Sequence, residues 1–201
     1  MAETSSPRLE SPSARPKKGW LNLFALLGCV VASYALYIEF THVSEADAKA
    51  LNIAAPTYFC DSLFSIPGVK VGCSHALTGP YGRVLRLWGI APPGSPLDVP
   101  NSALGLAYYL LALLPWHAHG ALAADAFMLA SAASLAFSVY LAYVLRFVLK
   151  ELCVICVSSY IINMVIFVLA ARMRMRLMDV NDHEENLAKA ARRAEEAKKG
   201  N

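Results

Sequence analysis

Long uncharged blocks alternate with polar segments along this chain. Residues 20–38 form the first block, and residues 152–171 form the last. Each block is close to the roughly 20 residues that a helix needs to cross the hydrocarbon core of a bilayer. Residues 99–124 also lack Asp, Glu, Lys and Arg, but they are too many for one span, and residues 115–120 mark a turn within them. The pattern therefore predicts four membrane-spanning helices, at about 20–38, 100–115, 122–149 and 152–171.

The first block has an alternative interpretation as a cleaved signal peptide. The long polar lead before it and the length of the apolar run favour an uncleaved span.

Residues 39–99 are predicted to form the one long loop between spans, and this loop contains Cys60 and Cys73. Residues 81–88 within it alternate as a short amphipathic helix lying on the membrane surface would. This half-helix is expected to place Arg83 and Arg86 near lipid headgroups. Its predicted apolar side consists of Val84, Leu85, Leu87 and Trp88. The predicted fold class is therefore all-α: an integral membrane four-helix bundle, at residues 19–172, with a cysteine loop and a half-helix.

Polar segments flank the bundle at both ends. Residues 1–18 are rich in Ser and Pro and end in basic residues, which is typical of a disordered arm. Residues 173–201 are charged and rich in Ala, with Glu and Lys or Arg at helical spacing, and are predicted to be a solvated helix or tail.

Composition and charge support a membrane protein and suggest its orientation. Hydrophobic residues make up 57% of the chain and charged residues 16%, which is too apolar for a soluble domain of this size. The net charge of +3 is not gathered on one surface, so nucleic acid is not an expected partner. Most of the Lys and Arg residues lie in the two tails, which favours cytoplasmic termini. The loop and the head of the last span then share the opposite, oxidising side, where disulfides persist.

A Cys-x-x-Cys pair, Cys153 and Cys156, stands at the head of the last span. Positions i and i+3 of a helix share a face, so the two sulfurs can approach each other. The positive end of the helix dipole favours a thiolate, which is the reactive form of cysteine. Cys29, the fifth cysteine, lies inside an apolar block and is interpreted as a small buried hydrophobe.

Three kinds of chemistry are open to the other four cysteines. They could bind structural zinc, although the spacing of Cys60 and Cys73 does not suit a second zinc knuckle. They could form two static disulfides, although a bridge between i and i+3 closes almost no loop and stabilises little. In the redox interpretation, the loop pair exchanges electrons with a soluble partner and with the Cys-x-x-Cys pair, which reacts with a substrate in the membrane.

Polar side chains near the pair could hold such a substrate. Tyr160 and Asn163 follow Cys156 at helical spacing on one face, and a phenol can donate a hydrogen bond to a quinone or epoxide oxygen. Asn101, at the head of the second span, could supply a second donor. Equally, Tyr160 could only bridge helices, and Asn101 could be an N-cap residue after Pro100.

Several motifs together carry a family resemblance. The sequence resembles the vitamin K epoxide reductases, and most closely the branch called vitamin K epoxide reductase-like, over residues 20–171. The matching motifs are Phe147–Tyr160, Pro100-Asn101-Ser102, Ser138–Ala142, Cys60-Asp61 and Cys73-Ser74.

The resemblance implies a role for each of these positions. Cys156 would attack the substrate and Cys153 would resolve the resulting bond. Cys73 would pass electrons to Cys153, and Cys60 would meet a luminal thioredoxin-like donor. The substrate oxygens would be held by Asn101 and Tyr160, and the apolar wall of the pocket would include Leu141 and Leu145.

The loop departs from the animal pattern of the family. The interval between Cys60 and Cys73 is longer than usual, and Leu77 and Tyr81 stand where Phe and Trp are usual. The resemblance therefore does not carry over the shape of the cap, the sensitivity to coumarin anticoagulants, or the preference between epoxide and quinone. Outside the matched region, Lys198-Lys199-Gly200-Asn201 resembles a dilysine signal for retrieval to the endoplasmic reticulum.

Together with this resemblance, the sequence predicts a vitamin K epoxide reductase that catalyses the warfarin-sensitive type of reaction in the endoplasmic reticulum membrane, with both termini cytoplasmic. It is expected to reduce vitamin K epoxide to the quinone, and the quinone to the hydroquinone, without a metal or a tightly bound cofactor. The first alternative is a quinone-dependent thiol oxidase that supports disulfide formation. The second is a non-enzymatic membrane scaffold with structural disulfides.

Overall fold

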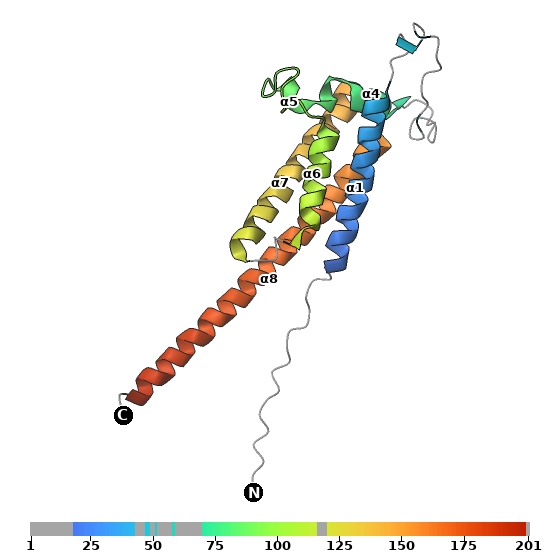
Figure 1. The fold of residues 1–201 in the computed structure, drawn as a ribbon. Coiled ribbons are helices and arrows are strands. Elements are labelled where there is room, and N and C mark those ends of the chain that lie inside the picture. Colours follow the sequence, from blue (N-terminus) through green and yellow to red (C-terminus); the bar gives the residue numbers. More distant parts are fainter. Residues whose placement is uncertain are drawn as a thin grey trace.

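The computed structural model describes residues 18–42, 47–48, 51, 58, 70–115 and 120–199 (Figure 1). Its main elements are the helices α1 (Lys18–Thr41), α6 (Asn101–Leu113), α7 (Ala121–Tyr143) and α8 (Val154–Lys199), with α7 continued by the π-helical turn η3 (Val144–Leu149). Five short elements complete the described chain: β1 (Lys70–Val71), α4 (Ser74–Thr78), the 3-10 turn η1 (Pro80–Gly82), α5 (Val84–Leu87) and β2 (Glu151–Leu152).

Three of the described helices are long and apolar enough to cross a membrane. They cover Gly19–Thr41, Ala121–Leu149 and Val154–Lys199. The helix α6 is also apolar, but its 13 residues extend only about 20 Å at 1.5 Å per residue. The prediction of an α-helical membrane protein is therefore confirmed, whereas the count of four spans stays a prediction.

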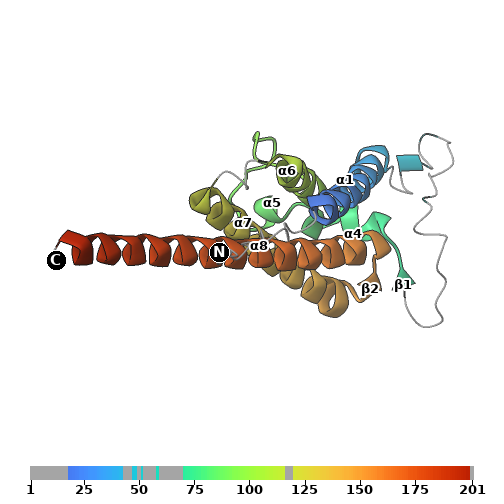
Figure 2. The same ribbon diagram turned by 90° about the horizontal axis from the view of Figure 1, so that it is seen from below.

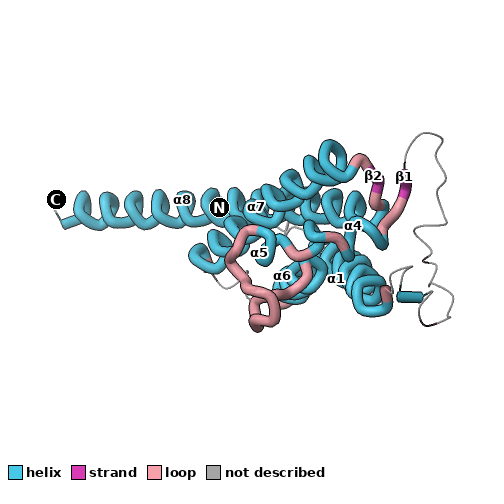
Figure 3. Tube along the Cα trace, turned by 90° about the horizontal axis from the view of Figure 1, so that it is seen from above, coloured by secondary structure: helices cyan, strands magenta, loops and turns pink. Residues whose placement is uncertain are grey.

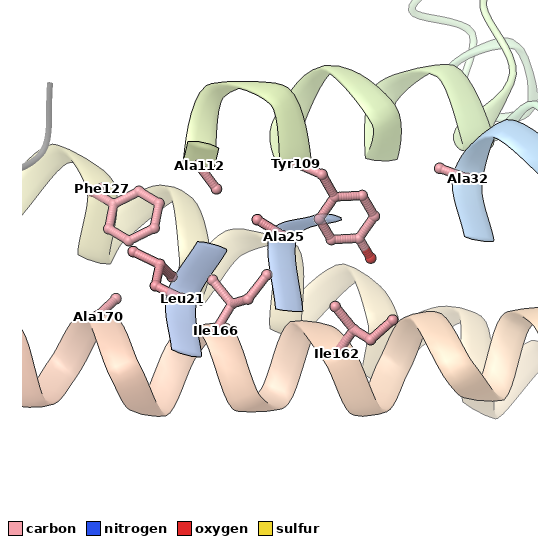
Figure 4. Close-up of a cluster of buried hydrophobic side chains, with 9 residues drawn as sticks. All are labelled: Leu21, Ala25, Ala32, Tyr109, Ala112, Phe127, Ile162, Ile166 and Ala170. Carbon is pink, nitrogen blue, oxygen red and sulfur yellow. The ribbon is translucent and has the colours of Figure 1, made fainter. Parts of the chain in front are cut away.

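The long helices pack around α1 and α8. The helix α1 contacts α6 and α8, and α7 contacts α8; Figure 2 shows this arrangement from below. One buried apolar cluster joins all four helices (Figure 4), with Tyr109, Phe127 and Ile166 as its largest members. A Cβ atom at Gly28 would lie 2.5 Å from the Tyr109 ring, so glycine allows α1 and α6 to approach this closely.

The short elements gather at one end of the bundle, opposite the Lys18 end of α1 and the far end of α8 (Figure 1). There β1 and β2 form a two-residue parallel pair, in which Lys70 faces Glu151 and Val71 faces Leu152 (Figure 3). Lys150 adopts a left-handed backbone conformation, with φ at 54°, and so turns the chain from η3 into β2.

The observed ends of α8 differ from the predicted span at 152–171. The helix begins at Val154, because Glu151–Leu152 is extended and Cys153 precedes the first turn. It then continues to Lys199, so the predicted tail is one helix with the last span. No Gly or Pro interrupts residues 154–199, and ion pairs at i,i+4 spacing support the exposed part, such as Glu185 with Lys189 at 2.6 Å.

The predicted half-helix is only partly observed. It divides into η1 and α5, with Val84 buried and Leu87 45% exposed, and its placement on a membrane surface stays a prediction. The guanidinium groups of Arg83 and Arg86 contact carboxylates of the chain itself. Residues 1–17 of the arm predicted at 1–18, and Cys60, lie outside the described residues, whereas Lys18 is the first residue of α1.

Candidate active site: a cavity at the head of α8

A cavity of about 420 Å³ lies among the four long helices and beneath η1 and α5. This volume is within the range of sites for small organic ligands, and the lining is mostly apolar with a few polar groups, as such sites usually are. The structure brings five of the eight residues predicted for the site to this one cavity: Asn101, Leu141, Leu145, Cys156 and Tyr160.

The cysteine pair forms a disulfide at the head of α8, with 5.3 Å between the Cα atoms of Cys153 and Cys156. Cys153 lies just before the helix rather than on its face. Its Sγ accepts a hydrogen bond from the backbone N–H of Cys156 at 3.2 Å, and its carbonyl accepts one from Val157 at 3.0 Å. Cys156 lines the cavity, whereas Cys153 is fully buried. The two sulfurs are therefore placed in different environments.

Cys73 is buried on the same side as Cys153. Both side chains are 0% exposed and belong to one apolar cluster, together with Ala35, Ile38, Tyr58, Ala76, Leu145 and Ile155. Two residues from segments 80 positions apart thus come together at the head of α8. Cys60, the other predicted relay cysteine, lies outside the described residues.

The Tyr160 side chain faces the cavity that Cys156 lines. Tyr160 lines the cavity one turn beyond Cys156, as predicted, and its hydroxyl makes no hydrogen bond to another residue in the described ranges. Asn163, on the same face, is instead held by the protein. Its Nδ2 donates to Ser138 at 2.8 Å, and its Oδ1 accepts from the Tyr109 hydroxyl at 2.9 Å.

Asn101 connects the head of α6 to the segment above the cavity. Its Oδ1 accepts the backbone N–H of Val84 at 3.1 Å, and its Nδ2 donates to the Tyr81 carbonyl at 2.6 Å. Pro100 precedes the first turn of α6, so Asn101 is not the N-cap residue that one interpretation of the sequence proposed. An amide nitrogen carries two protons, and these contacts use one of them.

Sequence reasoning missed a charged group at the edge of the cavity. Glu39 lines the cavity, and its carboxylate receives a hydrogen bond from Ser102 at 3.2 Å and an ion pair with Arg83 at 3.3 Å. Arg83 also donates to the Asp98 carbonyl at 2.9 Å. Glu39 is the first charged residue after the first apolar block, and this position at the end of a span could have indicated a functional carboxylate.

Asp98 is the anionic centre of the loop above the cavity. Arg86 donates to its carboxylate through Nε at 2.9 Å, and the Gly94 N–H donates at 3.3 Å. The hydrogen bond from Arg86 lowers the pKa of Asp98, with smaller lowering effects from Gly94 and from the positive charges of Arg86 and Arg83. Within the described ranges, no three His, Cys, Asp or Glu side chains gather as a metal site would require.

Comparison with known proteins adds to this geometry. Residues 20–171 match the family model described as the Vitamin K epoxide reductase family. The chain is 31% identical to vitamin K epoxide reductase complex subunit 1 of Mus musculus over 146 residues, which are 72% of this chain and 83% of the mouse protein. It is also 31% identical to the subunit of the same name from Rattus norvegicus over 139 residues, which are 69% of this chain and 78% of the rat protein.

Proposed function

Because the chain belongs to the vitamin K epoxide reductase family, we propose that it reduces vitamin K 2,3-epoxide to the quinone, and the quinone to the hydroquinone, with electrons from thiols. The observation that carries this proposal is the position of Cys156. In a multi-pass membrane protein, Cys156 of the Cys-x-x-Cys disulfide lines an apolar cavity. Tyr160 lines the same cavity, and no described residue forms a hydrogen bond with its hydroxyl.

The chemistry begins from the reduced pair. The Cys156 thiolate attacks the substrate, and Cys153 then attacks Cys156 to release the product and restore the disulfide. Epoxide and dithiol give quinone, disulfide and water. Quinone and dithiol give hydroquinone and disulfide. Each reaction transfers two electrons, and the two thiols supply the two protons, so atoms and charges balance.

The cavity lining would hold the substrate in place. Tyr160 and the remaining N–H of Asn101 would donate hydrogen bonds to the substrate oxygens, where negative charge develops during the reaction. Leu141 and Leu145 would form part of the apolar wall against the ring. All four side chains line the same cavity as Cys156, which supports this assignment.

Electrons would reach the pair through the loop cysteines. A luminal thioredoxin-like protein would reduce Cys60, and Cys73 would pass the electrons to Cys153. The burial of Cys73 and Cys153 in one cluster supports the second of these steps.

The proposal includes a location and a topology. Four spans, within a bundle at residues 19–172, would place both termini in the cytoplasm and the active site at the luminal side of the endoplasmic reticulum membrane. The polar segments 1–18 and 173–201 would be cytoplasmic, where Lys198 and Lys199 could act as a retrieval signal. The start of α1 and the end of α8 lie on the same side of the molecule, opposite the short elements, which supports this topology (Figure 1). The stretch Phe147–Tyr160 supports placement near the vitamin K epoxide reductase-like branch.

Turnover of vitamin K epoxide in membranes, with a small dithiol as reductant, tests the proposal. Activity should be present in the wild type and in Cys29→Ala, and lost in Cys153→Ala and Cys156→Ala. Retained turnover in either of the last two variants would contradict the assignment. Net oxidation of a partner's thiols by added quinone, without epoxide turnover, would favour the thiol oxidase instead.

A further inference from the structure

The segment just before Cys153 contacts the segment around Cys73 through backbone hydrogen bonds and through one pair of side chains. Besides the pairing of β1 with β2, the backbone N–H of Gly72 donates to the Leu152 carbonyl at 3.2 Å. Beyond the cysteine, His75 on α4 contacts Glu151 on β2, with 3.0 Å between Nδ1 and Oε2. Figure 3 shows β1 and β2 side by side next to α4.

These contacts flank the two cysteines. Cys73 lies between Gly72 and His75, and Cys153 directly follows the Glu151–Leu152 strand. Both cysteines are fully buried, so their sulfurs can meet only if the surrounding segments hold them close together. Exchange between a thiol and a disulfide requires direct attack of one sulfur on another, and a misplacement of about 1 Å can cost as much as 100-fold in rate.

The contact between the side chains of His75 and Glu151 fixes the register of β1 against β2. Two-residue strands form too short a ladder to fix a register by themselves. The Glu151 side chain is only 13% exposed, and a carboxylate removed from water needs a partner, whereas His75 is 69% exposed. Neither side chain is among the residues that line the cavity, so the pair has no direct role in holding substrate.

We propose that Glu151 and His75 are positioning residues, which hold Cys73 in register with Cys153 for electron transfer into the active-site disulfide. This inference rests on the proposed relay through the loop cysteines. The Cys73 thiolate attacks Sγ of Cys153, so a Cys73–Cys153 bond forms and the Cys153–Cys156 bond breaks. Cys156 leaves with the electron pair as a thiolate and takes up a proton. The Cys60 thiolate then attacks Cys73, so a Cys60–Cys73 bond forms, and Cys153 leaves as a thiolate that takes up a proton. A dithiol donor finally reduces the Cys60–Cys73 bond.

The transfer step can be measured without substrate. In the full-length chain with Cys29→Ala, Cys60→Ser and Cys156→Ser, only Cys73 and Cys153 remain of the five cysteines. Peptide mass spectrometry follows formation of the Cys73–Cys153 disulfide after addition of oxidised glutathione. Adding Glu151→Ala should slow its formation on the order of tenfold. The exposed residue Glu184 provides a matched control, and Glu184→Ala should leave the rate unchanged.

Two further variants separate positioning from general damage. His75→Ala alters only an exposed side chain and should slow the reaction as Glu151→Ala does. The exchanged pair, His75→Glu with Glu151→His, should restore most of the parent rate. The thermal midpoint of unfolding, measured in detergent, identifies any variant that has lost its fold. If Glu151→Ala does not fold, His75→Ala is used for the test instead.

The outcomes distinguish this inference from the function on which it rests. If Cys73 and Cys153 form no disulfide in the parent, the proposed relay fails. If the disulfide forms at the parent rate in folded Glu151→Ala or His75→Ala, the relay stands and the positioning role is wrong. An exchanged pair as slow as the single variants would also overturn the role of the contact between His75 and Glu151.

Discussion

The backbone N–H of Val84 donates to Oδ1 of Asn101 over 3.1 Å, and this bond joins the segment above the cavity to the head of α6. The same amide donates to the Tyr81 carbonyl from its other end. A side chain proposed to hold the substrate is thereby fixed by the backbone that covers the cavity. Closure of the cavity and orientation of the amide depend on one residue.

Asn101→Asp should remove the hydrogen bonds that this side chain donates and keep the one that it accepts. The carboxylate keeps an acceptor for Val84 but cannot donate to Tyr81 or to a substrate oxygen. Removing one such bond costs about 1–3 kcal/mol, so kcat/KM for the epoxide should fall roughly 10- to 100-fold. Steady-state kinetics in membranes measure the effect. An unchanged kcat/KM would contradict a substrate-binding role for the amide.

Tyr160→Phe should lower activity without lowering stability. No described residue hydrogen-bonds to the Tyr160 hydroxyl, so the fold loses no such partner when the oxygen is removed. If the hydroxyl stabilises charge on the substrate oxygen, kcat/KM should fall on the order of 100-fold. Thermal unfolding in detergent provides the control. A lower midpoint with unchanged kinetics would instead identify Tyr160 as a residue that only bridges helices.

Gly28→Ala should destabilise the contact between α1 and α6. The new Cβ would lie 2.5 Å from the Tyr109 ring, and overpacking of this kind costs about 1–3 kcal/mol. For a chain of this size, that corresponds to a midpoint lower by roughly 2–4 °C for each kcal/mol. Gly19→Ala is the matched control, because nothing lies within 4 Å of its added Cβ. Equal midpoints for the two variants would argue against the close approach.

The contact between Arg86 and Asp98 should make stability depend on pH in the acid range. The contact lowers the pKa of Asp98 in the folded protein, so its stabilisation is fully present above the unfolded pKa of about 3.9. It is lost as pH falls through the lower folded value. Thermal midpoints of wild type and Arg86→Ala should therefore differ near neutral pH and converge below about pH 4. A difference that grows as the pH falls would contradict this sign.

Local patterns in the sequence predicted the helices well, and the reason is that each apolar block carries its own signal. The block at 122–149 corresponds to α7 with η3, and the spacing of Cys156, Tyr160 and Asn163 placed all three at the cavity. The start of α8 was missed because β2 forms only by pairing with β1, about 80 residues away.

Contacts between segments far apart in the sequence could not be predicted, because no local sequence pattern indicates them. His75 and Glu151 are 76 residues apart, and neither stands in a pattern that points to the other. The same holds for Arg83 and Glu39, where the sequence suggested lipid headgroups for the arginine. Only the resemblance to a family placed Cys73 near Cys153, because spacing along a chain does not fix which loop meets which helix.

The hydrogen bond from the Cys156 N–H to Sγ of Cys153 has a consequence for the helix itself. Sγ of Cys153 satisfies one of the N–H groups that every helix leaves open in its first turn. When the disulfide is reduced, this acceptor becomes a thiol or thiolate, and a thiolate is the stronger acceptor at the positive end of a helix dipole. Each turnover therefore also changes the capping of α8, so that the redox state of the pair and the order of the first helical turn vary together.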